Sequence, residues 1–330
     1  MCSRTLFTIF DHMQNIIAPV DRQLLLNELT PERFLRHTNK GNKLVYLVNF
    51  HNAPNVLQEI GRLREVTFRA AGGGTGLPVD LDANDTSEDC YEQLIVWDPE
   101  TQEIVAGYRL IECSTAHRDE AGHINLSTAH LFGFSQKFVD EYLPLTIELG
   151  RSFVQPDYQP AAGSTKGLFS LDNLWDGLGA MIVLRPHIKY LFGKVTMYPH
   201  FNREARDFIL YFMNHYFPDP DELVRPHAAL RMGYETNVSQ FDGQLDGLEY
   251  KDGFKVLNTF VRGKGEMVPP LINTYMGLSP SMKNFGTALN DEFGAVEETG
   301  ILVTIADIYE EKKSRHIDTF ERDRFLEKAI

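Results

Sequence analysis

The 330-residue sequence is poor in cysteine and in positive charge. Its three cysteines, Cys2, Cys90 and Cys113, have spacings that fit neither a disulfide framework nor a zinc site, which favours a reducing compartment. Lys and Arg total 32 against 46 Asp and Glu, a formal net charge of −14. Nucleic-acid binders need a basic face that displaces phosphate counterions, so this balance argues against nucleic acid as a partner.

Long apolar runs are also lacking. No run approaches the roughly 18 residues of a membrane span, and the apolar part of Met1–Phe10 is too short for a signal peptide. With 43% hydrophobic and 24% charged residues, the composition excludes disordered and collagen-like chains and fits a globular protein. We therefore expect a cytoplasmic protein of one large domain or two modest ones.

Familiar ligand-binding signatures are missing too. The glycines of Gly72–Gly76 follow an expected helix and lack a Gly-Lys-Ser/Thr sequence, so they form neither a P-loop nor a dinucleotide-binding turn. A flap over a channel and a flexible connector both remain open for this loop. No His-Glu-x-x-His occurs, and we expect no metal site.

The hydrophobic pattern mixes strands with helices and predicts an α+β fold. Strands are expected at 44–50, 93–97, 103–111, 125–132, 146–154, 188–197, 254–261 and 301–308. Helices are expected at 56–69, 135–142, 166–184, 202–216 and 271–276. We divide the chain into an N-terminal extension (1–43), a core (44–217), a C-terminal elaboration that completes the sheet (218–309) and a charged tail (310–330).

The expected strand Thr146–Val154 carries an acid and a guanidinium close together. Regular alternation places Glu148 on one face and Arg151 on the other, among apolar residues, where an unpaired charge is costly. A bulge at Gly150 resets the alternation and brings Glu148 and Arg151 to one side. It also separates this strand from its neighbour and opens a slot.

Two more arginines lie within apolar elements. Arg64 follows the apolar stripe of the helix at 56–69, and Arg109 lies between apolar residues of a strand. Buried charges require partners, and we expect these to be Glu148 and the loop acids Asp85 and Asp89. Separate structural ion pairs, or buried stems with solvated heads, remain the alternative.

These residues occur in an order that resembles one branch of the GNAT N-acyltransferases. The order comprises Leu63–Phe68, acids at Asp85 and Asp89, Gly107–Leu110 and Glu148–Arg151. The branch includes acyl-homoserine-lactone synthases, N-acyl amino acid synthases and the acyltransferases that begin ornithine or glycine lipids. The glycine-rich loop and the sequences Glu-Leu-Gly-Arg-Ser-Phe-Val and Leu-Asp-Asn-Leu-Trp-Asp-Gly-Leu look most similar to the glycine-lipid type.

The resemblance implies a mixed, twisted sheet that splits beside a bulged strand, with helices on both faces. It also implies an acyl-acyl-carrier-protein (acyl-ACP) thioester as donor and no bound cofactor. Ordinary GNATs bind the CoA pyrophosphate with a Gln/Arg-x-x-Gly-x-Gly/Ala turn after the bulged strand, and residues 156–167 lack that spacing. Because Lys166 and Gly167 offer a phosphate-binding alternative, acyl-CoA stays open as donor.

The resemblance also assigns roles. Glu148 is expected to accept the amine proton, and the backbone around Leu149, Gly150 and Arg151 to stabilise the oxyanion. Arg64, Arg109 and Arg151 are candidates for the acceptor's carboxylate, which a guanidinium binds bidentately.

Other side chains receive supporting roles. An acyl channel is expected among aromatic and apolar residues, with plain core as the alternative: Phe68, Leu131, Phe132, Phe134, Phe138, Phe153 and Trp175. Carrier protein is acidic, and its expected contacts are Arg62, Arg69, Lys194, Arg203 and Arg206.

We therefore predict a bacterial N-acyltransferase that moves a long, 3-hydroxylated or plain acyl chain from acyl-ACP to a small amino acid of the glycine or ornithine type. This is the first step of an aminolipid, with transient contact to the inner membrane face. Two enzyme alternatives remain, an acyl-homoserine-lactone synthase and an acyl-CoA-dependent N-acetyltransferase. The absence of a Trp in the loop after Phe68 argues against the first. The third alternative is a non-catalytic protein that binds acyl carrier or lipid.

Overall fold

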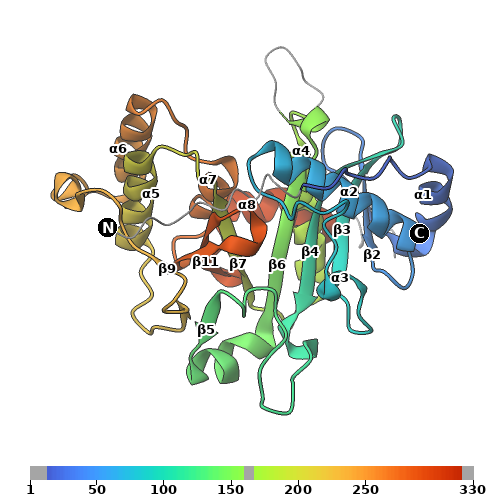
Figure 1. The fold of residues 1–330 in the computed structure, drawn as a ribbon, viewed down its shortest axis with the longest axis horizontal. Coiled ribbons are helices and arrows are strands. Elements are labelled where there is room, and N and C mark those ends of the chain that lie inside the picture. The colour runs from blue at the N-terminus through green and yellow to red at the C-terminus, as the bar shows by residue number, and fades with distance from the viewer. Residues whose placement is uncertain (1–12, 160–166, 322–330) are drawn as a thin grey trace.

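A nine-stranded mixed sheet runs through the computed structural model, which describes residues 13–159 and 167–321 (Figure 1). The strand order is β1-β2-β3-β4-β6-β7-β11-β10-β9. The β6–β7 pair is parallel and the other neighbours are antiparallel. These strands are β1 (Phe34–His37), β2 (Leu44–Val48), β3 (Glu92–Asp98), β4 (Glu103–Glu112), β6 (Thr146–Val154), β7 (Tyr190–Met197), β9 (Arg231–Met232), β10 (Lys283–Asn290) and β11 (Val296–Thr304). A separate antiparallel pair joins β5 (Phe132–Phe134) to β8 (Val224–Pro226).

Helices cover both faces of the sheet. The α-helices are α1 (Arg22–Glu28), α2 (Pro54–Ala70), α3 (Ala83–Thr86), α4 (Ser170–Leu184), α5 (Arg203–Tyr216), α6 (Tyr250–Gly263), α7 (Pro270–Met276) and α8 (Glu310–His316). Val45 and Leu94 pack in one core with α4 to α7, whereas their neighbours Tyr46 and Ile95 pack in another with α1 and α2. Successive strand residues point to opposite faces, so the two cores lie on opposite sides of the sheet.

Helix α2 forms because its apolar residues recur at helical spacing. Val56, Ile60 and Leu63 are buried on one stripe, and Pro54 occupies the first turn, where its missing N–H has no intrahelical partner to lose. Arg64 is fully buried on the same stripe, as the spacing predicts. This helix therefore carries a charge inward against the sheet.

One predicted strand is wrong. Residues 254–261 belong to helix α6, in which Leu257 and Val261 are buried four residues apart. The β-branched and aromatic residues of this segment favour a strand locally, but they pack against α5, where the rings of Phe208 and Phe260 lie 4.6 Å apart. Tertiary packing overrides the local preference here. The segment predicted as a strand at 125–132 contributes only its last residue, Phe132, to β5.

The sheet extends beyond the predicted core. Strand β1 lies in the predicted N-terminal extension and pairs with β2, with His37 opposite Leu44. Helix α8 lies in the predicted charged tail, and its His316 is buried, with Nδ1 2.7 Å from Asp176 Oδ1 of α4. Strands β10 and β11 complete the sheet from the predicted C-terminal elaboration. Residues 34–37 and 310–316, which the sequence analysis leaves outside the core, are thus part of the folded domain.

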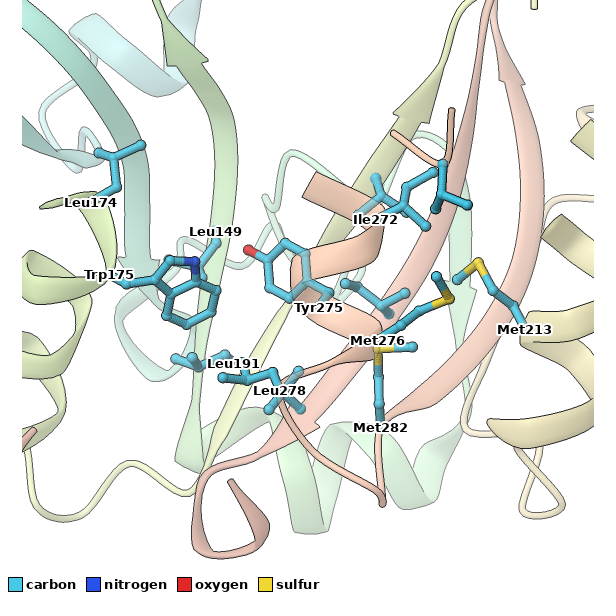
Figure 2. Close-up of a cluster of buried hydrophobic side chains, with 14 of the residues drawn as sticks. Leu149, Leu174, Trp175, Leu191, Met213, Ile272, Tyr275, Met276, Leu278 and Met282 are labelled. Carbon is cyan, nitrogen blue, oxygen red and sulfur yellow. The ribbon is translucent and has the colours of Figure 1, made fainter. Parts of the chain in front are cut away.

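An apolar cluster joins α4 and α7 to the central strands (Figure 2). Leu149 of β6 and Leu191 of β7 lie in this cluster beside Trp175 of α4 and Tyr275 of α7, whose rings are 5.6 Å apart. The hydroxyl of Tyr275 points towards Trp175 and Leu149 (Figure 2). No helix of the described residues is long and apolar enough to cross a membrane.

Candidate active site

Strand β6 has the predicted bulge. Gly150 pairs with Arg109 and Phe153 with Gly107, so β6 contains one residue more than β4 between these pairs. Arg151, inside the bulge, has a left-handed backbone with φ of 48°. A non-glycine residue rarely adopts this conformation unless its surroundings fix it. The irregular segment at Gly150–Arg151 is therefore held by the rest of the structure.

The sheet splits at the bulge. Strands β6 and β7 pair only from Thr146–Tyr190 to Leu149–Gly193. After that point β6 continues against β4, and β7 continues against β11. Gly193 is required at the last pair, because a Cβ there would lie 2.7 Å from the carbonyl oxygen of Leu149. The two strands diverge from there, which leaves Gly150 and Lys194 on opposite sides of a cleft.

Both sheet faces contribute to this cleft. Its lining includes Phe68 of α2, Tyr275 of α7, Phe293 before β11, and the ionic side chains of Arg151, Lys194 and Glu298. The cleft is partly open to solvent, and its cavity volume is about 50 Å³. That volume holds a few water molecules, so it is too small for a long acyl chain without movement of the lining side chains.

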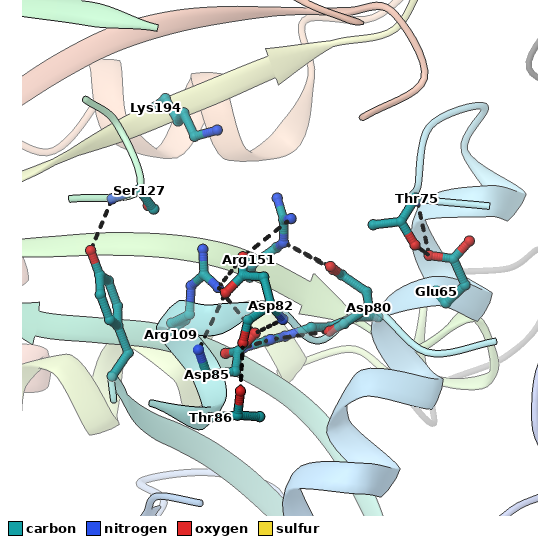
Figure 3. A network of polar contacts seen from close by, with 12 residues as sticks. Glu65, Thr75, Asp80, Asp82, Asp85, Thr86, Arg109, Ser127, Arg151 and Lys194 are labelled. Carbon is teal, nitrogen blue, oxygen red and sulfur yellow. Dashed lines mark hydrogen bonds and ion pairs between the residues drawn. The ribbon is translucent and has the colours of Figure 1, made fainter. Parts of the chain in front are cut away.

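Arg64 and Arg109 share one buried acid, Asp85. Figure 3 shows Asp85 beside Arg109. Arg64 Nη1 lies 3.0 Å from Asp85 Oδ1, and Arg109 Nη1 lies 3.0 Å from Asp85 Oδ2. Gln93 donates to Asp85 Oδ1 at 2.9 Å and accepts from Arg64. All four side chains are buried. Arg64 and Arg109 therefore stay away from the cleft, and we expect them to position the site rather than to bind the acceptor.

Two further acids, Asp80 and Asp82, connect the bulge to the same network. Arg151 Nε lies 2.9 Å from Asp80 Oδ2, and its guanidinium carbon lies 4.3 Å from the centre of the Phe293 ring. Asp82 caps α3 and accepts from Arg109 Nη1 at 2.7 Å. The loop that carries Asp80 and Asp82 is thus held by its acids between α2 and the sheet.

Burial and the neighbouring charges together decide the direction of each pKa shift in this network. Burial raises the pKa of Asp80, against the opposing guanidiniums of Arg151 and Arg64. Burial also disfavours the charged form of Asp85, but Arg64 and Arg109 outweigh it and hold the pKa of Asp85 well below its usual range. The pKa of Arg109 is raised by Asp85 and Asp82 despite its burial. Asp85 is therefore a fixed negative charge.

Glu148 does not meet Arg151, so the predicted pairing is wrong. Glu148 is fully buried and accepts hydrogen bonds from the Tyr91 hydroxyl, from the backbone N–H of Ser127 at 3.1 Å and from that of Thr128 at 2.8 Å. Its position on β6 precedes the bulge, and Arg151 takes Asp80 instead. Glu148 holds the loop at Ser127 beside Gly150, where a Cβ would lie 3.5 Å from Ser127 Oγ.

Asp89 lies outside the network. Its side chain is 63% exposed, and its carboxylate lies 4.0 Å from His117. Asp80 and Asp82, rather than Asp89, pair with the buried arginines. A signal for Asp82 was present, because an acid three residues before Asp85 fits a capping box.

The glycine-rich loop is fixed by Glu65 of α2. The Glu65 carboxylate accepts from Thr75 N at 3.0 Å, from Thr75 Oγ1 at 2.8 Å and from Gly76 N at 2.8 Å (Figure 3). Gly73 lies against Phe293 and Val296, where a Cβ would meet Val296 at 3.2 Å. The loop is thus held by Glu65 on one side and packs against Phe293, which lines the cleft, on the other.

The expected acyl channel is not preformed. Phe68 lines the cleft and forms an edge contact with Phe293 at 5.1 Å. Trp175 approaches it only through Tyr275, and Phe153 packs in the core under α2. The remaining residues predicted for the channel pack in a third core near β5: Leu131, Phe132, Phe134 and Phe138. These four residues are therefore part of a hydrophobic core, which is the alternative that the sequence leaves open for them.

The expected docking cations each have an acidic partner among the described residues. Arg62 pairs with Glu59, Arg69 with Glu65 and Lys194 with Glu298. Arg203 and Arg206 both pair with Glu297. They form no free basic patch. The described residues also contain no group of His, Cys, Asp and Glu side chains that is arranged to hold a metal ion.

Sequence comparisons identify relatives over nearly the whole chain. The chain is 54% identical over 308 residues to a glycine N(alpha)-acyltransferase of Bacteroides thetaiotaomicron, covering 93% of this chain and 91% of the relative. It is 50% identical to a protein of the same name from Phocaeicola vulgatus, covering 93% and 94%. Residues 63–166 match the family model of an acetyltransferase (GNAT) domain.

Similar solved structures are more distant. FeeM, an N-acyl amino acid synthase from uncultured soil microbes, gives a TM-score of 0.39 at 11% identity, covering 83% of this chain and 94% of FeeM. BjaI, a CoA-dependent acyl-homoserine-lactone synthase, gives 0.38 at 13% identity, covering 85% and 89%.

Proposed function

The chain belongs to the glycine N(alpha)-acyltransferase family, and we propose that it joins a long fatty acyl group from an acyl-ACP thioester to the amino group of glycine. Membership confirms the predicted GNAT fold and the predicted acyltransferase class. The observation that carries the proposal is the split between β6 and β7 at Gly150 and Lys194, which gives a thioester arm a path into the sheet.

The bulge fits the chemistry of acyl transfer. Amide formation from a thioester passes through a tetrahedral oxyanion, which fixed backbone N–H groups stabilise strongly. After Leu149, β7 supplies no ladder partner to β6, so we assign this role to the backbone of Leu149–Arg151 beside the cleft. The buried pairs of Arg64, Arg109 and Arg151 hold that backbone from the α2 side.

The charge around α4 favours carrier protein over CoA as the donor. In nucleotide-binding GNATs, the helix after the bulged strand receives the pyrophosphate at its N-terminus. Here the first turn of α4 carries Asp172, a carboxylate that pairs with Arg315. Carrier protein presents the pantetheine arm without the adenosine diphosphate, so this acid opposes CoA more than acyl-ACP.

The acyl chain enters through the apolar wall. Tyr275 and Leu271 of α7 line the cleft next to the apolar cluster of Figure 2. Their displacement connects the bulge to that cluster and makes room for a chain, plain or 3-hydroxylated. The product is an acidic amphiphile that partitions into a lipid surface, so we expect brief membrane contact during product release and a role in aminolipid synthesis.

The test is incubation with palmitoyl and 3-hydroxypalmitoyl thioesters of ACP and of CoA, each with glycine, ornithine or no acceptor. Mass spectrometry of the lipid extract should find N-acylglycine, formed faster from acyl-ACP. If N-acylornithine is the main product, glycine is not the preferred acceptor. If acyl-CoA reacts faster than acyl-ACP, carrier protein is not the preferred donor. Thiol release without any amide would indicate a hydrolase.

A further inference from the structure

A buried ion pair inside the cleft has no part in the chemistry described so far. Lys194 of β7 pairs with Glu298 of β11, and their side chains are 8% and 3% exposed. Both line the cleft. In the register of the sheet, Lys194 follows the last β6–β7 pair, Leu149–Gly193, so it stands across the split from Gly150.

The position of this pair is unusual on energetic grounds. Desolvating two charges costs several kcal/mol per ion, and well-packed apolar residues often replace such a pair without loss of stability. Glu148 forms hydrogen bonds to Tyr91, Ser127 and Thr128, whereas Glu298 pairs with Lys194 alone in the part of the chain that the structure describes. Glu298 is thus the carboxylate at the split that is free to exchange its partner.

We propose that Lys194 and Glu298 form the acceptor site, with Lys194 binding the glycine carboxylate and Glu298 binding the ammonium group and taking its proton. The inference rests on the proposed function and names the residues that recognise its acceptor. Free glycine carries one positive and one negative charge, and the Lys194–Glu298 pair presents the complementary two beside the backbone that binds the thioester.

The atoms balance with this assignment. The ammonium group gives one proton to Glu298, and the neutral nitrogen attacks the thioester carbon as the carbonyl oxygen becomes the oxyanion. The carbon–sulfur bond then breaks and the sulfur leaves as a thiolate, which takes the second proton of the nitrogen. Glu298 returns its proton to water, so each turnover yields N-acylglycine, carrier thiol and one proton.

The environment of Lys194 responds to an arriving anion. Burial lowers the pKa of Lys194, with Glu298 acting in the opposite direction and Arg151 and Arg109 adding to the lowering. A glycine carboxylate placed beside Lys194 adds an opposite charge and favours the charged form of Lys194. The groups facing Glu298 are Lys194, Tyr198, whose pKa is raised to about 12 chiefly by burial, and His130.

Glu298→Gln tests the proton transfer. Without the carboxylate the amine must lose its proton to water, so turnover should fall by about 10²–10⁴-fold near neutral pH. The rate of E298Q should then rise about tenfold per pH unit as free glycine deprotonates, while the parent protein levels off. A pH profile of E298Q parallel to that of the parent protein would overturn the role of Glu298.

Glu297→Gln is the matched control. Glu297 is the preceding residue of β11, equally buried, and it pairs with Arg203 and Arg206 away from the cleft. E297Q should lose stability and keep the parental pH profile. If both variants change the profile alike, the effect is structural and the proposal is wrong.

Lys194→Met tests recognition of the carboxylate. K194M should raise the KM for glycine by about tenfold or more and leave the KM for glycinamide unchanged, because glycinamide has no carboxylate. Calorimetric binding of glycine to the unreacted protein gives a readout that needs no turnover. If the parent protein acylates glycine and K194M changes neither the binding of glycine nor its KM, this inference alone is wrong. If the parent protein neither binds nor acylates glycine, the inference and the proposed function both fail.

Discussion

Asp85 is the acid on which the buried network depends, and its replacement by Asn gives a sharp prediction. Its two oxygens contact Arg64 and Arg109 at 3.0 Å each, and Gln93 donates to it at 2.9 Å. Asp85→Asn removes the charge and turns an amide group toward one guanidinium. Arg64 and Arg109 are then left buried with a positive charge that is only partly compensated, Arg109 still having Asp82.

The expected size follows from the burial. Removing one partner of a buried ion pair costs about 3–5 kcal/mol, because the remaining charge stays desolvated. We expect D85N to lower the free energy of unfolding by about 3 kcal/mol or more and to reduce turnover, since the bulge is held from this network. Asp89→Asn is the control, because this exposed carboxylate should change the unfolding free energy by less than about 0.5 kcal/mol.

Urea unfolding followed by circular dichroism measures the unfolding free energy of both variants. The pH dependence of that free energy adds an independent check. The folded state lowers the pKa of Asp85 below its ordinary value of 3.8, so the stabilisation is complete above about pH 5 and is lost progressively as the pH falls further. The difference in unfolding free energy between the parent protein and D85N should become smaller over that pH range. D85N and D89N of equal stability at pH 7 would refute the reasoning.

Three further changes test other parts of the site. Arg151→Met leaves the carboxylate of Asp80 buried without its nearest cation, so the pKa of Asp80 should rise further, as carboxyl NMR titration can measure, and turnover should fall. Gly193→Ala places a Cβ 2.7 Å from a carbonyl oxygen of β6 and should lower the unfolding free energy by about 1–3 kcal/mol in thermal or urea unfolding. Phe68→Leu should alter the preference for acyl-chain length in competition assays, whereas Phe132→Leu, in a separate core, should lower stability alone.

The sequence predicts which residues of the site are buried or bulged better than it predicts which side chains pair with one another. An arginine among apolar residues next to Gly150 is a local conflict, and a bulge resolves it, as the structure confirms. The burial of Arg64 follows from helical spacing alone. The choice of Asp80 for Arg151, and of the backbone at Ser127 and Thr128 for Glu148, depends on how two loops fold over the sheet, and nothing local encodes it.

Partners that lie far apart in the sequence escape prediction for the same reason. Lys194 and Glu298 meet only because β7 and β11 pair in a particular register, with Thr196 opposite Glu298. In the sequence, Lys194 is one charge in an otherwise apolar strand, and its charge alone places it among the cations expected to contact carrier protein. No local pattern marks Glu298. A charge inside a buried strand is therefore a useful indication of a site even when its partner is unknown.

The two walls of the cleft differ in what holds them, and this difference decides how an acyl chain enters. The α2 side is fixed by ion pairs of Arg64, Arg109 and Arg151, and the strands are fixed by their ladders. Helix α7 has seven residues, too few to be stable alone, and contributes Leu271 and Tyr275 to the lining. The cavity of about 50 Å³ must widen to accept a chain. We expect α7, which carries no charged residue, to be the wall that moves. The charged wall then keeps the reacting atoms aligned while the apolar wall moves.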